Sequence, residues 1–181
     1  FFQRMDRDVN GRLSHFEFLM SLDEEKSDFL ERVFLIADMD ASGELDFVEL
    51  VGAIFLYAAQ STTGLVGYVF DMFDKDRSGS LDFSEVVALV TCVYGGSLGE
   101  QVVRILDAVD VDSDGNVSLA EFSKRSHAYP LLLFPAFQMQ QRLKLYSFGE
   151  GHWSKETNRR HEIFGDRWMV RMGRRGRAGR E

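Results

Sequence analysis

The sequence has very little cysteine and proline: one cysteine, Cys92, and two prolines occur in 181 residues. A single cysteine excludes an internal disulfide and favours a reducing, cytoplasmic compartment. The neighbours of Cys92 in VVALVTCVY are apolar, which indicates a small buried residue rather than a redox thiol. The chain also lacks an apolar run of about 18 residues, so we expect no transmembrane span.

Motifs of the common catalytic classes are missing as well. The sequence holds no GxxxxGK phosphate loop, no GxSxG nucleophile turn and no CxxC pair. Its four histidines are scattered, and His161 and Glu162 begin HEIFG, which lacks the second histidine of the HExxH zinc motif. We therefore expect a protein that is not an enzyme.

Oxygen-bearing side chains are abundant, and the segment DKDRSGSLDFSE at residues 74–85 concentrates them. Ca²⁺ takes about six to eight oxygen ligands from carboxylates, carbonyls and water, so a loop of this composition predicts a Ca²⁺ site. Gly79 allows the sharp bend in the middle, and Glu85 offers both carboxylate oxygens at the end. Leu81 is apolar among polar neighbours, which predicts a short β bridge to a partner loop.

The same twelve-residue pattern occurs four times, at residues 6–17, 38–49, 74–85 and 110–121, which we call loops 1 to 4. In each loop the first and third places are Asp, the sixth is Gly and the twelfth is Glu. The loops start 32, 36 and 36 residues apart, and four repeats in register make chance a negligible explanation. We expect four competent Ca²⁺ sites.

The expected ligands follow from the place of each residue in its loop. Place 7 acts through its backbone carbonyl, and place 9 acts through a bridging water. The direct ligands are Asp6, Asp8, Asn10, Arg12 and Glu17; Asp38, Asp40, Ser42, Glu44 and Glu49; Asp74, Asp76, Ser78, Ser80 and Glu85; and Asp110, Asp112, Asp114, Asn116 and Glu121. The water-mediated ligands are Ser14, Asp46, Asp82 and Ser118, and the bend glycines are Gly11, Gly43, Gly79 and Gly115.

The loops differ in the number of carboxylates that they offer at places 1, 3, 5, 9 and 12. Loop 1 has three, because Asn10 and Ser14 are neutral, whereas each of the other loops has four. More carboxylates generally tighten binding, so we expect the first site to be the weakest. Asp46 and Asp82 are short acidic residues at place 9, which predicts that loops 2 and 3 can hold Mg²⁺ at rest.

The segments on either side of the loops have a helical pattern. An apolar pair stands four residues and one residue before each first Asp, and the residue after each Glu is again apolar. Ser97 and Glu100 form a capping box, a further helix-start signal. The sequence therefore predicts an all-α protein in which helix, loop and helix occur four times, with short β bridges between paired loops. The apolar pairs are Phe2 and Met5, Phe34 and Ala37, Phe70 and Phe73, and Leu106 and Val109, and the residues after the loops are Phe18, Leu50, Val86 and Phe122.

These loops resemble those of the EF-hand superfamily, and ERVFLIADMDASGELDFVELVGAIF and VFDMFDKDRSGSLDFSEV are similar to the calmodulin and calcineurin regulatory-subunit style. The resemblance covers residues 1–126 and implies two EF-hand pairs, which we expect at 1–60 and 61–126. It also implies that Ca²⁺ opens an apolar groove for a helix of a partner protein. FFQRM gives fewer than two helical turns before Asp6, so we expect that the first entering helix is truncated and that further residues lie upstream.

Residues 127–181 form an extension of opposite charge, with 11 basic and 5 acidic residues against 10 basic and 24 acidic residues in 1–126. We expect an amphipathic helix whose apolar stripe is Ala136, Met139, Leu143 and Tyr146, with Gln140, Gln141, Arg142 and Lys144 largely away from it.

Two interpretations of this helix stay open: it packs on its own lobe, or it occupies the target groove as a built-in competitor. In the second case, removal of residues 127–181 should raise the affinity for a target helix. The expected partner or self-docking residues are Met139, Leu143, Tyr146, Trp153 and Trp168.

The chain ends in RMGRRGRAGRE, which is rich in Arg and Gly. We expect this segment to be disordered, because it has no apolar surface to offset the entropy of ordering. Its charge can attract RNA or anionic lipid, but no RNA-binding signature accompanies it. We therefore expect no specific nucleic-acid partner, and peripheral membrane contact stays open.

Three functions are compatible with the whole pattern. The first is a Ca²⁺ sensor or regulatory subunit that binds a target protein helix. The second is a Ca²⁺ buffer or structural module, in which the ions hold the fold and little opens. The third is a regulatory fragment of a larger Ca²⁺-controlled enzyme. The long basic extension with two tryptophans favours an interaction protein over a plain buffer.

Overall fold

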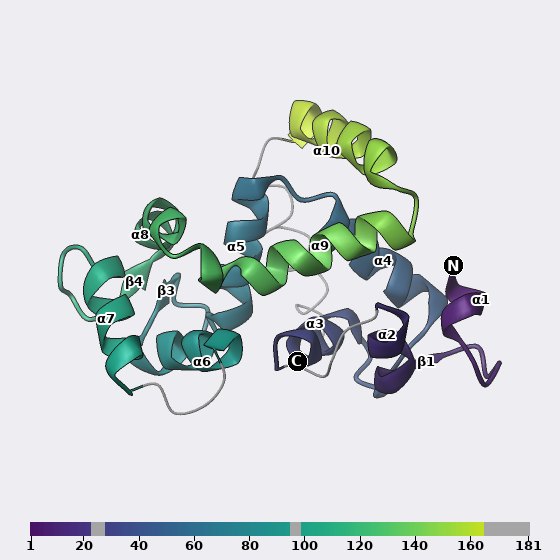
Figure 1. Cartoon of the computed structure of the whole chain (residues 1–181), viewed down its shortest axis with the longest axis horizontal. Coiled ribbons are helices and arrows are strands. Elements are labelled where there is room, and N and C mark those ends of the chain that lie inside the picture. The colour runs from purple at the N-terminus through teal and green to yellow at the C-terminus, as the bar shows by residue number, and fades with distance from the viewer. Residues whose placement is uncertain (23–27, 95–98, 165–181) are drawn as a thin grey trace. The chain divides into compact units, whose positions relative to one another are not determined.

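The computed structural model describes residues 1–22, 28–94 and 99–164 (Figure 1). The chain divides into two compact units. The first unit combines Phe1–Ser61 with the described residues from Gln138 onward, and the second unit is Thr62–Phe137. Each unit therefore contains two of the four loops, and the C-terminal extension contributes to both units.

The first unit contains loops 1 and 2, each between two helices, and part of the extension. Strands β1 and β2 join the two loops as an antiparallel bridge, with Leu13 opposite Leu45. The elements of this unit are α1 (Phe2–Met5), β1 (Leu13–Ser14), α2 (His15–Ser21), α3 (Asp28–Ala37), β2 (Glu44–Leu45), α4 (Phe47–Ala58), the later residues of α9 (Phe134–Tyr146) and α10 (Glu150–Phe164).

The second unit repeats this arrangement with loops 3 and 4. Strands β3 and β4 are antiparallel, with Leu81 opposite Val117. The elements are α5 (Thr62–Phe73), β3 (Ser80–Leu81), α6 (Phe83–Tyr94), α7 (Gly99–Val109), β4 (Val117–Ser118), α8 (Leu119–Arg125), the 3-10 turns η1 (Ser126–Ala128) and η2 (Pro130–Leu132), and the first residues of α9. The expected all-α class with short bridges between paired loops is confirmed.

Apolar residues at repeated places of the loops form the core of each unit. The place-8 residue lies on the β bridge and is at most 1% exposed in every loop. The residue that follows each place-12 Glu is also buried, in the first turn of the helix that leaves the loop. Burial of both positions fixes each loop against its partner and against the helices. These residues are Leu13, Leu45, Leu81 and Val117 on the bridges, and Phe18, Leu50, Val86 and Phe122 in the helices.

The apolar face of α7 differs by one residue from the expected one. Val102, Ile105 and Val109 are buried at helical steps of three and four. Leu106, which the sequence pattern placed on this face, is only half-buried. Ile105 and Leu106 are both apolar, so the sequence pattern allows either of them on the buried face. Because a helix turns by about 100° per residue, this choice shifts the centre of the buried face by that angle.

Two helix starts and the lengths of the helices complete the fold. Helix α9 begins at Phe134 and has Pro135 in its first turn, where the missing N–H removes no helical hydrogen bond. The expected capping box at Ser97 falls outside the described residues, and α7 begins at Gly99. Among the helices that the structure describes, none is both long enough and apolar enough to cross a membrane.

Candidate functional site

Each loop ends in a capping box that starts the following helix. In loop 1 the Ser14 hydroxyl accepts the backbone N–H of Glu17 at 3.3 Å, and the Glu17 carboxylate accepts the backbone N–H of Ser14 at 3.0 Å. The same reciprocal bonds join Asp46 with Glu49 and Ser118 with Glu121. In loop 3, Asp82 and Glu85 exchange the corresponding bonds at 2.9 and 3.1 Å. The place-9 residue is therefore the N-cap of the exiting helix, the helix that follows the loop.

Place 9 was expected only as a water-mediated ligand, and its capping role was not expected. The signal was present, because places 9 to 12 read SHFE, DFVE, DFSE and SLAE, and Ser or Asp followed three residues later by Glu is the capping-box pattern. Place 12 is thus both an expected metal ligand and the third residue of the exiting helix.

The other oxygen of the place-12 carboxylate reaches across the loop to its beginning. Oε1 of Glu17, Glu49 and Glu121 accepts the backbone N–H of place 2 at 2.8, 2.8 and 2.9 Å. Glu85 accepts the N–H of Lys75 in the same way, at 2.6 Å. Each glutamate therefore connects the first residues of its loop with the first turn of the exiting helix.

The first-place Asp organises the middle of the loop. In loops 1 to 3 its Oδ1 accepts the N–H of place 5 at 3.0 Å. In all four loops its Oδ2 accepts the N–H of the bend glycine at 2.9 to 3.0 Å. These glycines have φ between 80° and 87°, a conformation that side chains rarely adopt. A glycine is therefore needed at place 6 for the bend.

Place 4 is also left-handed, although no residue type at that place indicates this conformation. Val9, Ala41, Arg77 and Ser113 have φ of 58° to 60°. This conformation is disfavoured for residues other than glycine, and it is most unusual for a β-branched one such as Val9. Loop 1 therefore carries backbone strain that the other loops carry to a smaller degree.

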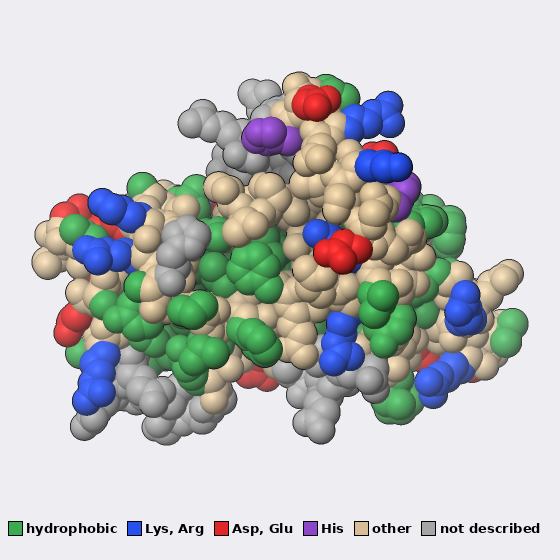
Figure 2. Space-filling view, turned by 45° about the horizontal axis from the view of Figure 1, so that its top comes forward, with side chains coloured by type: hydrophobic (Ala, Val, Ile, Leu, Met, Phe, Trp, Pro, Cys, Tyr) green, Lys and Arg blue, Asp and Glu red, His purple; other side chains and the backbone are tan. Residues whose placement is uncertain are grey.

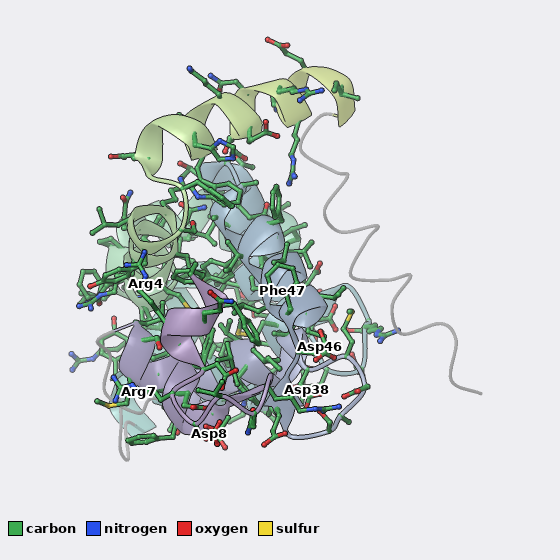
Figure 3. The ribbon with its side chains drawn as sticks, turned by 90° about the vertical axis from the view of Figure 1, so that its right-hand side faces the viewer. Arg4, Arg7, Asp8, Asp38, Asp46 and Phe47 are labelled. Carbon is green, nitrogen blue, oxygen red and sulfur yellow. The ribbon has the colours of Figure 1, made fainter. Side chains whose placement is uncertain are left out.

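The loops bring the expected carboxylate ligands together in four clusters. In each cluster the ligand oxygens of places 1, 3 and 12 lie within 4.8 Å of one another. The first and twelfth places are largely buried while the third is exposed. In Figure 3, Asp8 of loop 1 and Asp38 of loop 2 lie at the same end of the first unit, as their bridge requires. The clusters are Asp6, Asp8 and Glu17; Asp38, Asp40 and Glu49; Asp74, Asp76 and Glu85; and Asp110, Asp112 and Glu121.

The remaining expected direct ligands are linked in pairs, because the place-5 side chain contacts the place-7 backbone in every loop. Asn10 and Asp114 accept the N–H of Arg12 and Asn116 through Oδ1, at 2.7 and 2.8 Å. The hydroxyls of Ser42 and Ser78 donate to the carbonyls of Glu44 and Ser80 at 2.9 and 2.8 Å. In loops 2 and 3 the place-7 carbonyl, an expected ligand, thus lies next to the expected ligand at place 5.

The donor set of these clusters suits a hard divalent cation. Ca²⁺ prefers carboxylate and carbonyl oxygens, and these are what the loops bring together. Loop 4 gives a specific indication: Oδ1 of Asp110 is buried and has no hydrogen-bond partner among the described residues. A buried carboxylate oxygen without a partner is costly, and coordination to a cation would satisfy it. The residues therefore fit Ca²⁺.

Comparison with known families agrees with this geometry. Residues 66–126, which contain loops 3 and 4, match the family model of the EF-hand domain pair. The chain contains an EF-hand domain pair. Loops 1 and 2 share the bridge, the capping box and the carboxylate cluster of the matched pair, so we refer to them as the first EF-hand pair and to loops 3 and 4 as the second. A search of curated protein sequences found no match. EF-hand loops of this composition indicate Ca²⁺ binding.

The extension also contributes buried residues to the fold. Met139, Leu143 and Trp153 are at most 2% exposed, whereas Tyr146 is 42% exposed and lies off the buried face. Trp168 and the segment RMGRRGRAGRE are outside the described residues. The expectation for Gln140 is wrong: its side chain is buried rather than directed away from the apolar stripe, because it bonds two backbone carbonyls. A polar side chain with such partners can share an apolar face.

Hydrogen bonding lowers the pKa of two place-12 glutamates. The backbone N–H and the hydroxyl of Ser14 lower the pKa of Glu17 to about 2. The hydroxyl of Ser118, which donates to Glu121 at 2.6 Å, is the main cause that lowers the pKa of Glu121 to about 2. These bonds favour the charged carboxylate, which is the form that binds a cation.

The lowered values predict a loss of stability in acid. A carboxyl group whose pKa is lower in the folded state stabilises the fold above its unfolded pKa of 4.5, and this contribution disappears as the pH falls toward about 2. Without Ca²⁺, the urea midpoint of unfolding should therefore fall between pH 4.5 and 2. Ser118→Ala should raise the pKa of Glu121 toward 4.5 in a carboxylate NMR titration, whereas Ser113→Ala at an exposed place of the same loop should not. An unchanged pKa in Ser118→Ala would contradict the assignment.

Loop 1 should bind Ca²⁺ most weakly. It has the fewest carboxylates, it holds Val9 in a strained conformation, and the cationic Arg12 stands at place 7, where it forms an exposed ion pair with Glu44 at 4.0 Å. The amides of Gly11, Gly43, Gly79 and Gly115 donate to the first Asp of each loop, so their NMR shifts report each site separately. In a Ca²⁺ titration Gly11 should shift last. Filling of loop 1 before the others would show that ligand charge does not control the order.

Proposed function

We propose that the chain is a Ca²⁺ sensor or regulatory subunit that acts by binding a helix of a partner protein and has no catalytic activity of its own. The observation that carries this proposal is the double role of the place-12 glutamate. It is an expected bidentate ligand, and it is also the third residue of the exiting helix. Binding and helix position are therefore connected through one side chain in each loop.

The hydrogen bonds of this glutamate explain how binding would alter the helices. Its two oxygens accept backbone N–H groups from places 2 and 9. Bidentate coordination draws on the same two oxygens, so filling of a site acts directly on the carboxylate and on the helix turn attached to it. Because the two loops of a pair are joined by a bridge, the adjustment in one loop affects its partner.

Composition supports a narrow range of partners. Sensor surfaces that accept many targets are rich in Met, because its side chain adapts to different shapes. The two EF-hand pairs hold only Met5, Met20, Met39 and Met72, and of these only Met20 and Met39 are exposed. We propose a cytoplasmic location, which the single cysteine supports.

Fluorescence of an apolar-surface dye, titrated with Ca²⁺ in the presence of millimolar Mg²⁺, tests this function on the full chain. A sensor should increase dye binding at micromolar free Ca²⁺, in the range of about 10⁻⁷ to 10⁻⁵ M that is usual for such sites. A variant with glutamine at all four place-12 positions provides the control and should give no increase. If the chain binds Ca²⁺ and the dye signal stays flat both in the full chain and in a chain without residues 127–181, the protein is a buffer or structural module.

We infer that loops 2 and 3 can hold Mg²⁺ at rest. Both have Asp at place 9, and in both the Oδ1 of this Asp is engaged by the N–H of place 12, at 2.8 and 2.9 Å. The second oxygen remains for water or metal. Millimolar Mg²⁺ should therefore shift the amides of Gly43 and Gly79 more than those of Gly11 and Gly115. Equal amide shifts at all four glycines on addition of Mg²⁺ would contradict this inference.

A further inference from the structure

The C-terminal end of α4 is bound by side chains of the extension. Nε2 of Gln140 donates to the carbonyls of Tyr57 and Gln60 at 3.1 and 3.0 Å. Oγ1 of Thr157 donates to the carbonyl of Ala59 at 3.2 Å. The last carbonyls of a helix have no partner within the helix, so donors from elsewhere in the chain satisfy them. Residues 80 or more positions later in the sequence thus cap α4.

The extension also binds the end of α2. Nη1 of Arg142 donates to the carbonyl of Leu22, the C-cap residue of α2, at 2.7 Å. A cation is favourable there because of the helix dipole. Since α2 and α4 are the exiting helices of loops 1 and 2, the extension holds both exiting helices of the first EF-hand pair. In Figure 3, α10 lies at the end of this unit opposite the labelled loop residue Asp8.

An apolar anchor accompanies these polar bonds. Trp153 is fully buried, and its ring meets Phe55 of α4 edge-on at a centroid distance of 4.9 Å. Its Nε1 donates to the hydroxyl of Ser147 at 2.8 Å, so its polar group is satisfied. The guanidinium of Arg160 lies 5.0 Å from the same Phe55 ring. A buried Trp with a nearby Arg is typical of the residues that contribute most to a binding interface.

We propose that residues 138–164, the docked segment, occupy the surface that the first EF-hand pair offers to a partner helix, and that the partner binds by displacing them. This inference rests on the proposed function. On α9, Met139 and Leu143 are buried four residues apart and Gln140 is bonded between them, which is the spacing of anchors that a helix uses to bind a groove. The neighbouring residue Gln141 is exposed.

Linkage then gives the effect on Ca²⁺. An occupant that binds the Ca²⁺-loaded pair better than the Ca²⁺-free pair must raise the Ca²⁺ affinity of loops 1 and 2 by the same factor. A tethered occupant also acts at an effective concentration of roughly millimolar, so a free helix competes poorly with it until it is released. The docked segment therefore both tightens the first pair and protects it from weak partners.

The charges around the docked segment allow one substitution to release it from the first EF-hand pair. Figure 2 shows acidic, basic and histidine side chains interspersed on α10, so its outer face has no large region of one sign. By contrast, the inner contact of Gln140 is with carbonyls at the negative end of α4. Gln140→Glu replaces the amide donor by a carboxylate of nearly the same size. The carboxylate is repelled by the two carbonyls, which destabilises the docked position of the segment. Gln141→Glu makes the same change of charge on the exposed side.

The test uses the full chain and a fluorescent peptide with the sequence of residues 134–153, FPAFQMQQRLKLYSFGEGHW. With Ca²⁺ at saturation, the Gln140→Glu chain should bind this peptide about tenfold more tightly than the unaltered chain, because a buried acceptor now faces two others. The Gln141→Glu chain should bind it like the unaltered chain. In the Gln140→Glu chain, the free Ca²⁺ concentration at which the amide shifts of Gly11 and Gly43 are half complete should rise severalfold. The corresponding concentration for Gly79 and Gly115 should stay the same.

A second pair of variants repeats the test without adding a charge. Arg142→Ala removes the bond to Leu22 and should act like Gln140→Glu, and Arg159→Ala is the control because the Arg159 side chain is 71% exposed. Equal peptide affinity in Gln140→Glu and Gln141→Glu would overturn the inference, even if dye binding still responds to Ca²⁺ and the sensor function stands. Tighter peptide binding that is the same with and without Ca²⁺ would support displacement and contradict the sensor function.

Discussion

Replacing Glu49 with glutamine should lower the Ca²⁺ affinity of loop 2 about 100-fold, within the span over which EF-hand loops are tuned by ligand charge. The substitution removes one negative charge and the symmetric bidentate carboxylate. It should leave the exiting helix intact, because glutamine also completes a capping box with Asp46. The loss is therefore expected in the metal affinity and not in the helix content, which circular dichroism measures.

Glu44→Gln in the same loop is the matched control. Glu44 stands at place 7, where only the backbone carbonyl is an expected ligand, and its side chain takes part in the exposed ion pair with Arg12. Exposed pairs of this kind contribute little, so the Ca²⁺ affinity should change less than about threefold. Calorimetric titration of the two variants compares them directly. Equal affinities would mean that the place-12 side chain does not close the site. Glu85→Gln would then be expected to leave the Ca²⁺ affinity of loop 3 unchanged as well.

Replacing Trp153 with alanine should destabilise the first unit by about 3–5 kcal/mol, the usual cost of truncating a fully buried large aromatic side chain. Trp153 is completely buried, contacts Phe55, Phe148 and His152, and holds a hydrogen bond to Ser147. Its loss leaves a cavity between α10 and α4. Urea unfolding, followed by amide signals of the first unit at saturating Ca²⁺, measures the change.

Tyr146→Ala provides the aromatic control for this prediction. Tyr146 is 42% exposed on α9, and an exposed substitution away from the core should change the free energy of unfolding by about 0.5 kcal/mol or less. If Trp153→Ala is as mild as Tyr146→Ala, the extension does not contribute to the stability of the first unit, and the contacts of α10 with α4 are not maintained in solution.

The fold class was predictable because two strong sequence signals coincide. The twelve-residue repeat marks the loops, and the apolar place-8 residue marks the bridge, so that Leu13 with Leu45 and Leu81 with Val117 could be anticipated as pairs. Apolar residues at helical steps then define the flanking helices. Each of these features is local, and local features are what a single sequence displays most clearly.

The docking of the extension was not predictable in the same way. The pattern of α9 shows an apolar stripe but does not say which lobe covers it, since apolar contacts are not specific for a partner. Gln140 was assigned to the outer face because polar residues are usually exposed. Its role depends on two carbonyls about 80 residues earlier in the chain, and no periodicity signals a hydrogen bond of that kind. The left-handed place 4 was missed because it has no preferred residue in these loops.

The central claim is that ion binding in the loops moves the exiting helices. A Ca²⁺ titration of the full chain by NMR, in millimolar Mg²⁺, tests it most directly by following two sets of amides: the bend glycines, and the C-cap residues Leu22 and Ala59 at the far ends of α2 and α4. The account predicts that Leu22 shifts with the same midpoint as Gly11, and that Ala59 shifts with the same midpoint as Gly43. Shifts at the glycines with no change at Leu22 and Ala59 would contradict it, because the loops would then bind Ca²⁺ without transmitting the event to the helices.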